Sequence, residues 1–314
     1  MDIPNDRSSH TVPTPSGGGL AIVGSFYIGM FWLGLTGTIQ QSVLAAIIPA
    51  TLVVAVIGQW DDIRPIPARW RMAVHMAATI WVLFCIGGIT SIQFGSNIIH
   101  LGWFGWMFAG VLLVWHLNLF NFMDGIDGLA GMQVVYICFS ATLITFFFSF
   151  QTGVSGQQNV EWLTITLGLA TIGFLYWNWP PAKIFMGDVG SGFLGLAVGI
   201  VLLVSVRSNQ LNLGVWLILL AAFLIDASYT LLRRMLTGKK WYQAHCTHAY
   251  QQAAKKFGHL RVTLIVLLIN CAWLLPNALL AAVFPRYQFL ILLLAYLPLL
   301  ILVNKLRAGE EIMN

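Results

Sequence analysis

The sequence predicts an all-α, polytopic integral membrane protein, and its composition is the first reason. Of its 314 residues, 58% are hydrophobic and only 9% are charged, whereas soluble globular proteins contain roughly 25% charged residues. A soluble core of this size could not bury so much apolar surface. The second reason is that apolar stretches long enough to cross a bilayer recur along the chain, without the residue alternation that barrel strands require.

Ten candidate spans follow from the rule that a membrane-crossing helix needs about 20 apolar residues. In chain order they are residues 19–38, 42–58, 72–88, 103–119, 131–150, 160–177, 191–206, 213–232, 262–283 and 287–304. Helices are expected because lipid cannot satisfy free backbone groups. The polar break Ser91–Gly102 is predicted to form a short hairpin outside the bilayer. The chain shows no internal repeat, so residues 1–314 are interpreted as one transmembrane domain.

The distribution of basic residues predicts the orientation, because cytoplasmic loops carry an excess of lysine and arginine. With the N-terminus in the cytoplasm, alternating spans place fourteen of the sixteen basic residues on the cytoplasmic side: Arg7, Arg64, Arg69, Arg71, Lys183, Arg233, Arg234, Lys239, Lys240, Lys255, Lys256, Arg261, Lys305 and Arg307. Residues 233–261 are then cytoplasmic, and residues 151–159 lie on the opposite side together with Arg207 and Arg286. The net charge of +5 therefore indicates membrane orientation and no nucleic-acid partner.

The acidic residues follow the same alternation. Five carboxylates fall at cytoplasmic helix ends or loops, namely Asp61, Asp62, Asp124, Asp127 and Asp188, while Glu161 lies on the opposite side and Asp226 lies within a span. Carboxylates from three separate loops are thus expected at one face of the membrane. The four cysteines, Cys85, Cys138, Cys246 and Cys271, contain no C-x-x-C pair, so neither a disulfide framework nor a zinc site is indicated.

The first acidic motif is "GQWDDIRPIPARWR" (Gly58–Arg71). Asp61 and Asp62 end a span, and adjacent carboxylates repel unless a cation or metal offsets them. Arg71 has the charge to hold a phosphate. The alternatives are a solvated loop with helix-ending acids and, for Arg71, a positive-inside anchor.

The second motif is "NLFNFMDGIDGLAG" (Asn118–Gly131). If this stretch is helical, residues three apart share a face, and a polar stripe results from Asn118, Asn121, Asp124 and Asp127. The intervening glycines allow close approach of a ligand or a neighbouring helix. Polar groups at membrane depth are more often functional than structural, although a structural role is the alternative.

The third motif is "NWPPAKIFMGDVGSGFLG" (Asn178–Gly195). Two prolines break the preceding helix, and glycines surround Asp188 where the next span begins. Backbone amides at a helix N-terminus suit phosphate, and an aspartate beside phosphates suits Mg²⁺, which takes oxygen ligands. Phe185 is placed to stack on a base. The alternative is a tight interhelical turn with a capping aspartate.

The fourth motif, "HCTHAYQQAAKKFGH" (His245–His259), lies in the longest polar segment. His245 and His248 are three residues apart and have lysines nearby, a combination that fits pyrophosphate. Two histidines are too few for zinc. Together the four motifs predict phosphoryl transfer, which depends mainly on positioning and charge neutralisation, between a phosphate ester and a lipid substrate. A soluble reaction would not need ten spans.

In order along the chain, these motifs, together with "PNDRSSHTVPTPSGGG" and "HCTHAYQ", resemble the polyprenyl-phosphate N-acetylhexosamine-1-phosphate transferases of glycosyltransferase family 4. The chain looks most like the members that start O-antigen or related polysaccharides. The resemblance implies that a UDP-N-acetylhexosamine donates its sugar-1-phosphate to undecaprenyl phosphate, a membrane lipid, and releases UMP. It also implies Mg²⁺ as the cofactor, with Mn²⁺ as an alternative, and a location in the bacterial inner membrane. A homodimer is compatible with it.

Motif matching to this family also implies roles for individual residues. Asn121 and Asp188 would bind Mg²⁺, and the catalytic group would comprise Asp61, Asp62 and Asp124. The nucleotide sugar and its pyrophosphate would be held by Asn118, Asp127, Phe185, Arg71, His245 and His248. The resemblance does not decide between attack by an aspartate and direct attack by the lipid phosphate.

The chain departs from the family pattern at two places. Family members have a span before the "PNDRSSH" motif, which is expected to be lacking here, and Ser16 stands where a basic residue is common. One alternative is the peptidoglycan-precursor transferase of the same family, which shows adjacent histidines where this chain has His245-Cys-Thr-His248. An alternative of another class is a secondary transporter of an anionic solute, which predicts charges near span centres and repeat symmetry.

Overall fold

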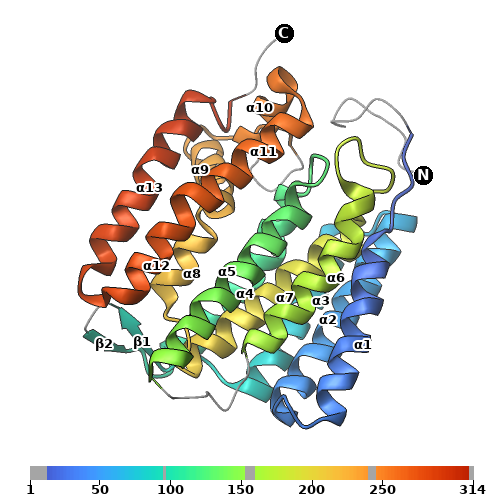
Figure 1. The fold of residues 1–314 in the computed structure, drawn as a ribbon. Helices are drawn as coiled ribbons and strands as arrows, with labels where there is room; N and C mark the ends of the chain where they lie inside the picture. The colour runs from blue at the N-terminus through green and yellow to red at the C-terminus, as the bar shows by residue number, and fades with distance from the viewer. Residues whose placement is uncertain (1–12, 95–96, 153–159, 240–244, 311–314) are drawn as a thin grey trace.

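The structure is a computed structural model that describes residues 13–94, 97–152, 160–239 and 245–310. It is a bundle of long, roughly aligned helices (Figure 1), which confirms the all-α, multi-pass membrane fold. The helices of the first half are α1 (Gly19–Leu35), α2 (Gln41–Ile63), α3 (Ala68–Ile86), α4 (Phe104–Met123), α5 (Leu129–Thr152) and α6 (Val160–Asn178). The second half begins with α7 (Gly187–Arg207), α8 (Leu213–Leu219), α9 (Ala221–Leu236) and α10 (Ala249–Phe257).

Two further apolar stretches complete the bundle. In the first, α11 (His259–Ile269), a π-helical turn (Asn270–Leu274) and α12 (Leu275–Val283) follow one another without a break. In the second, a 3₁₀ turn (Pro285–Tyr287) leads into α13 (Gln288–Lys305). The prolines at the starts of α12 and of the 3₁₀ turn suit a first helical turn, where no backbone donor is needed.

Among the described residues, seven helices are long and apolar enough to cross a membrane, or eight if α8 and α9 form one broken span. A helix lies in each of the ten predicted ranges. The predicted number of ten spans is nevertheless not confirmed. Helix α1 has only 17 residues, and α3, although 19 residues long, is not among the helices that are apolar enough to cross a membrane. Two arginines in its first turn lower the mean hydropathy of α3.

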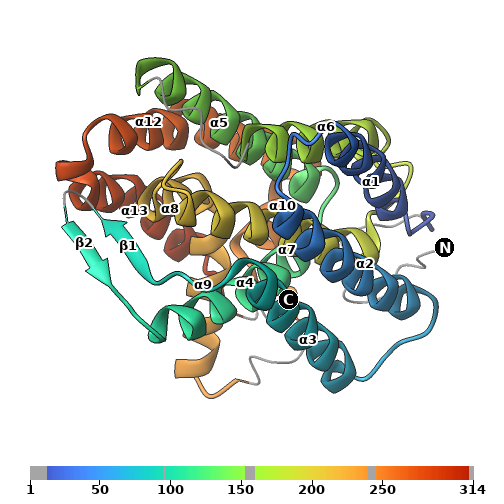
Figure 2. The ribbon, with the colours of Figure 1, turned by 90° about the horizontal axis from the view of Figure 1, so that it is seen from below.

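Helix α7 forms the centre of the bundle, and its entire apolar stretch is buried. Glycines allow this central position because they let backbones approach. A Cβ atom at Gly195 would come within 2.5 Å of the His116 carbonyl oxygen in α4, and one at Gly190 would come within 2.8 Å of the Gly19 Cα in α1. Figure 2 shows α7 among its neighbours, viewed along the bundle. Residues at the ends of α7 are therefore held in fixed positions.

The predicted hairpin is confirmed. Strands β1 (Ser91–Phe94) and β2 (Asn97–His100) pair antiparallel, with Ser91 opposite His100. In Figure 1 this hairpin lies at the lower end of the bundle, whereas α10 and the α4–α5 and α6–α7 connections lie at the upper end. The bundle therefore has two chemically different ends, and the predicted carboxylates lie at the end opposite the hairpin.

Candidate active site

The first polar group at the upper end is an acid cluster built around the start of α7. Arg71 of α3 lies between two carboxylates: its Nη1 is 2.5 Å from Asp61 Oδ2 and 2.9 Å from Asp188 Oδ2. Asp61, near the end of α2, also accepts a hydrogen bond from the backbone N–H of Ile66 at 2.6 Å. Arg71 thus joins helices α2, α3 and α7.

Asp62 has a different role from its neighbour. Its two carboxylate oxygens accept hydrogen bonds from the backbone N–H groups of Asp188 (2.8 Å) and Val189 (3.2 Å). It therefore caps the N-terminus of α7, where free amides and the helix dipole favour negative charge. Gly187 allows this contact, since a Cβ there would come within 2.4 Å of Asp62 Oδ2. Of the amides at this helix start, those of Asp188 and Val189 are thus engaged by Asp62, and phosphate binding by the glycine amides of the turn stays a prediction.

The structure brings together the two residues expected to bind a metal. Asn121 Nδ2 of α4 donates to Asp188 Oδ1 at 2.7 Å and lies 3.3 Å from Ser191 Oγ. Within the described part of the chain, no three His, Cys, Asp or Glu side chains converge as a metal site. Asn121 presents its amide nitrogen to Asp188, and the carboxylate oxygens of Asp188 and the hydroxyl of Ser191 nevertheless fit Mg²⁺, which usually takes one or two carboxylates together with water and substrate phosphates.

The predicted polar stripe from Asn118 to Asp127 is wrong beyond its first half, because α4 ends at Met123. Asn118 donates to the Val114 carbonyl oxygen of its own helix at 2.7 Å. Asp127 lies beyond the turn, where its Oδ1 is 3.1 Å from His259 Nδ1 and its Oδ2 accepts from the Ala182 N–H at 3.0 Å. These contacts tie the α4–α5 connection to α11 and to the α6–α7 connection, which gives Asp127 a structural role beside the predicted binding role.

Asp124 follows directly after α4 and is partly buried. Burial raises the pKa of its carboxyl well above the usual range, and the nearby charges of Asp188 and Asp62 raise it further. Asp61 and Asp188 share Arg71, while Asp62 and Asp188 act on Asp124 through their charges, and this accumulated negative charge favours a proton or a metal cation. A carboxyl group with a raised pKa holds a proton more readily than an ordinary aspartate and is therefore suited to exchange a proton with a substrate.

Replacing Asp124 by asparagine tests this environment. A carboxyl group whose pKa is raised in the folded state destabilises that state increasingly as pH rises above its ordinary value of 3.8. We expect Asp124→Asn to raise the unfolding temperature of the metal-free protein in detergent, more at pH 7 than at pH 5, with the difference vanishing near pH 3, below the ordinary value of 3.8. An equal effect at all three pH values would contradict the raised pKa.

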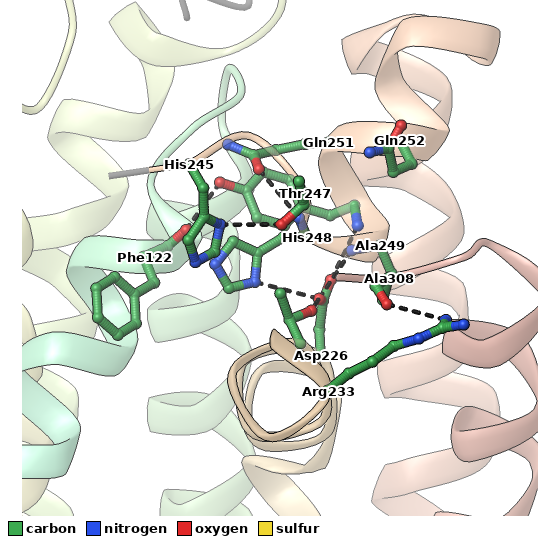
Figure 3. A network of polar contacts seen from close by, with 12 residues as sticks. Phe122, Asp226, Arg233, His245, Thr247, His248, Ala249, Gln251, Gln252 and Ala308 are labelled. Atoms are coloured by element: carbon green, nitrogen blue, oxygen red, sulfur yellow. Dashed lines mark hydrogen bonds and ion pairs between the residues drawn. The ribbon is translucent and has the colours of Figure 1, made fainter. Parts of the chain in front are cut away.

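The second polar group joins α9 to the start of α10 and is centred on Asp226 (Figure 3). Its Oδ1 accepts from the Ala249 N–H at 2.8 Å and lies 3.3 Å from His248 Nδ1, while its Oδ2 accepts from the Tyr250 N–H at 2.9 Å. Asp226 thus caps α10 and fixes the His248 ring with one carboxylate. In the sequence, the only signal for this role was that Asp226 is an acidic residue within a predicted span.

His248 itself is buried, with 1% of its surface exposed. Its Nε2 has no hydrogen-bond partner among the residues that the structure describes. The His245 ring lies 4.9 Å away, centroid to centroid, and His245 Nδ1 is 3.1 Å from Thr247 Oγ1. The two histidines predicted to act together therefore do lie together, with His248 anchored on Asp226.

Tyr250 connects the two polar groups. Its hydroxyl donates to the Phe122 carbonyl oxygen at 2.8 Å, and the Phe122 ring stacks on His248 at 6.0 Å. Burial raises the pKa of the Tyr250 hydroxyl well above its usual range, and the charges of Asp226 and Asp124 add to this effect. The last turn of α4 thus carries Asn121 in the acid cluster and Phe122 against His248, so both groups form one site.

The glycine run after Ser16 serves close packing. A Cβ at Gly18 would come within 2.6 Å of the Phe174 ring, and one at Gly19 within 2.4 Å of Gly190 Cα. The Gly18 N–H donates to the Phe185 carbonyl oxygen at 2.9 Å, so this segment docks on the turn before α7. Phe185 is partly buried beside the acid cluster. The "PNDRSSH" motif falls in residues 1–12, and Lys240 in residues 240–244, both outside the described residues.

An apolar cavity of about 150 Å³ lies directly beside this site. Its lining comes from the ends of α4 and α5, from α9, α10 and α11, and from the second half of α13, and it includes Met123, Phe223, Asp226, Tyr250, Val266 and Leu302. Apart from Asp226, the residues that line it are hydrophobic. A polar group and an apolar cavity thus adjoin at the upper end of the bundle.

Comparison with known proteins agrees with this arrangement. The model of glycosyl transferase family 4 matches residues 44–206, more than half of the chain. A probable undecaprenyl-phosphate N-acetylglucosaminyl 1-phosphate transferase of Bacillus subtilis is 26% identical over 86% of this chain and 74% of its own length. A phospho-N-acetylmuramoyl-pentapeptide-transferase of Desulfotalea psychrophila is 29% identical over 72% of this chain and 68% of its own length. The chain belongs to glycosyl transferase family 4.

Proposed function

We propose that the protein transfers N-acetylhexosamine-1-phosphate from a UDP-sugar to undecaprenyl phosphate and releases UMP. The observation that carries this proposal is the group of Asp61, Asp62, Asp124 and Asp188 at the start of α7, two of which contact Arg71, joined through α4 to an apolar cavity. Negatively charged phosphates and a long apolar chain are the two features that such a site can accommodate together. The product would start a lipid-linked surface polysaccharide of the O-antigen type.

The transfer forms a P–O bond between the lipid phosphate and the sugar-bearing phosphorus and breaks the P–O bond to UMP. Asn121 and Asp188 would hold Mg²⁺, which when bound neutralises pyrophosphate charge. Arg71 supplies a second positive charge 2.9 Å from Asp188. Asp124 is the group suited to take a proton at the reacting phosphates, and His245 and His248 would hold the pyrophosphate from the other side.

The apolar cavity supports a lipid acceptor. It lies between α9, α10, α11 and α13 and touches Asp226 and Tyr250, so a chain entering from the membrane would bring its phosphate towards His248. The basic residues support a cytoplasmic location for this end of the bundle in the bacterial inner membrane, because most of them belong to connections on the same side as the carboxylates. A cytoplasmic site would have direct access to UDP-sugars.

The experiment is a UMP-release assay with purified protein in detergent. The panel contains undecaprenyl phosphate with UDP-N-acetylglucosamine, UDP-N-acetylgalactosamine or UDP-N-acetylmuramoyl-pentapeptide, each with Mg²⁺, Mn²⁺ or EDTA. We expect UMP only when a UDP-N-acetylhexosamine, the lipid phosphate and a divalent cation are all present. UMP release with the pentapeptide donor alone would assign the protein to the peptidoglycan pathway, and a lack of UMP release with every donor would contradict the proposal.

A further inference from the structure

The chain bends sharply between α8 and α9, by 79° at Leu220. A break in a helix at membrane depth leaves carbonyl groups without their usual partners, and lipid cannot replace them. Here two carbonyls of α8 accept hydrogen bonds from side chains of other helices. Tyr296 of α13 donates its hydroxyl to the Leu217 carbonyl oxygen at 2.9 Å, and Gln133 Nε2 of α5 lies 3.3 Å from the Leu219 carbonyl oxygen.

Gln133 is itself held in place. Asn270 Nδ2 donates to Gln133 Oε1 at 2.6 Å, and both side chains are fully buried. Because the oxygen of Gln133 accepts from Asn270, its nitrogen is left to face Leu219. Asn270 is the first residue of the π-helical turn, a local widening that often occurs at functional positions. A polar chain therefore runs from α11 through α5 to the bend.

The bend decides where the end of α9 lies. Asp226 follows Leu220 by less than two helical turns, so the direction of α9 sets the position of the Asp226 carboxylate. That carboxylate holds the His248 ring and the first two amides of α10. A different bend would move His248 relative to Asn121 and Asp188, which are carried by the separate helices α4 and α7.

We propose that Gln133, Asn270 and Tyr296 are positioning residues: by holding the bend at Leu220 they align the Asp226–His248 group with the acid cluster. None of the three lies in either polar group. The kinetic part of this inference rests on the proposed function, whereas the part that concerns the bend does not. If these residues only stabilised the fold, replacing them would lower the unfolding temperature as the loss of any buried polar contact does, and would leave the bend and kcat unchanged.

The test uses Gln133→Leu and Asn270→Leu, which remove the polar chain, and the milder Tyr296→Phe, which removes one hydroxyl. The matched control is Asn277→Leu: Asn277 is also buried and lies along the same span as Asn270, but its Nδ2 donates to the Trp273 carbonyl oxygen, one turn earlier along that span. Spin labels at Ile28→Cys on α1 and Leu236→Cys on α9, both exposed, report the bend by electron–electron distance measurements. The background lacks the four native cysteines and must retain wild-type activity.

We expect the three test variants to broaden or shift the label–label distance distribution and to lower kcat by about tenfold, with KM for the UDP-sugar little changed. Asn277→Leu should leave both unchanged even if it lowers the unfolding temperature. An unchanged distance distribution in Tyr296→Phe and in whichever leucine variants fold would overturn the inference, as would an altered distribution with wild-type kcat. If the wild-type protein releases no UMP, the proposed function fails, and the distances still decide whether these residues hold the bend.

Discussion

Replacing Asp188 by asparagine is expected to lower kcat by about 100-fold or more, which corresponds to roughly 2.7 kcal/mol of transition-state stabilisation. Asp188 contacts Arg71 and Asn121 directly and lies among the other aspartates of the acid cluster. Asparagine keeps the shape and an acceptor oxygen but removes the negative charge that a metal cation requires. The measurement is UMP release at saturating substrates over a range of Mg²⁺ concentrations.

Stability must be measured alongside, because the side chain of Asp188 also joins α7 to α3 and α4. We expect Asp188→Asn to unfold in detergent at nearly the wild-type temperature, since the amide can still accept from Asn121. The matched control is Glu161→Gln at the start of α6, the other end of that helix from the acid cluster, which should retain full activity. Near-normal, Mg²⁺-dependent turnover by Asp188→Asn would exclude Asp188 as a metal ligand.

The second large effect is expected for His248→Asn, with a fall in kcat of about 100-fold, within the range typical of a positioned acid–base or charge-stabilising group. The His248 ring is fixed by Asp226 through Nδ1, and among the described residues its Nε2 lacks a partner. Asparagine can still donate to Asp226, so α10 should keep its cap. Activity is measured as UMP release, and folding by thermal unfolding.

His100→Asn is the control for this experiment, because His100 lies exposed in the hairpin at the opposite end of the bundle. It should retain wild-type activity and stability. If His248→Asn unfolds early yet keeps wild-type kinetic constants, the Asp226–His248 contact serves only to build the start of α10, and the predicted pyrophosphate contact is wrong.

Several features follow from the sequence because they depend on local composition. Apolar length and polar breaks located a helix in each predicted range, and the polar stretch after α3 indicated the hairpin between Ser91 and His100. The family resemblance implied that Asn121 and Asp188 act together, and the structure places Asn121 Nδ2 2.7 Å from Asp188 Oδ1. The helix predictions succeed because a helix in lipid must satisfy its backbone internally, so its extent is visible in the chain itself.

Only the tertiary structure decided which hydrogen-bond partners come from distant helices. The sequence could not show that Asp62 caps α7, that Asp226 anchors His248, or that Gln133 supports the bend at Leu220. Helix α4 ends at Met123, which separates Asp127 from the stripe that periodicity had indicated. Hydrogen bonds between helices depend on how the helices pack and bend, and neither packing nor bend angle is encoded in the hydrophobic period of a single segment.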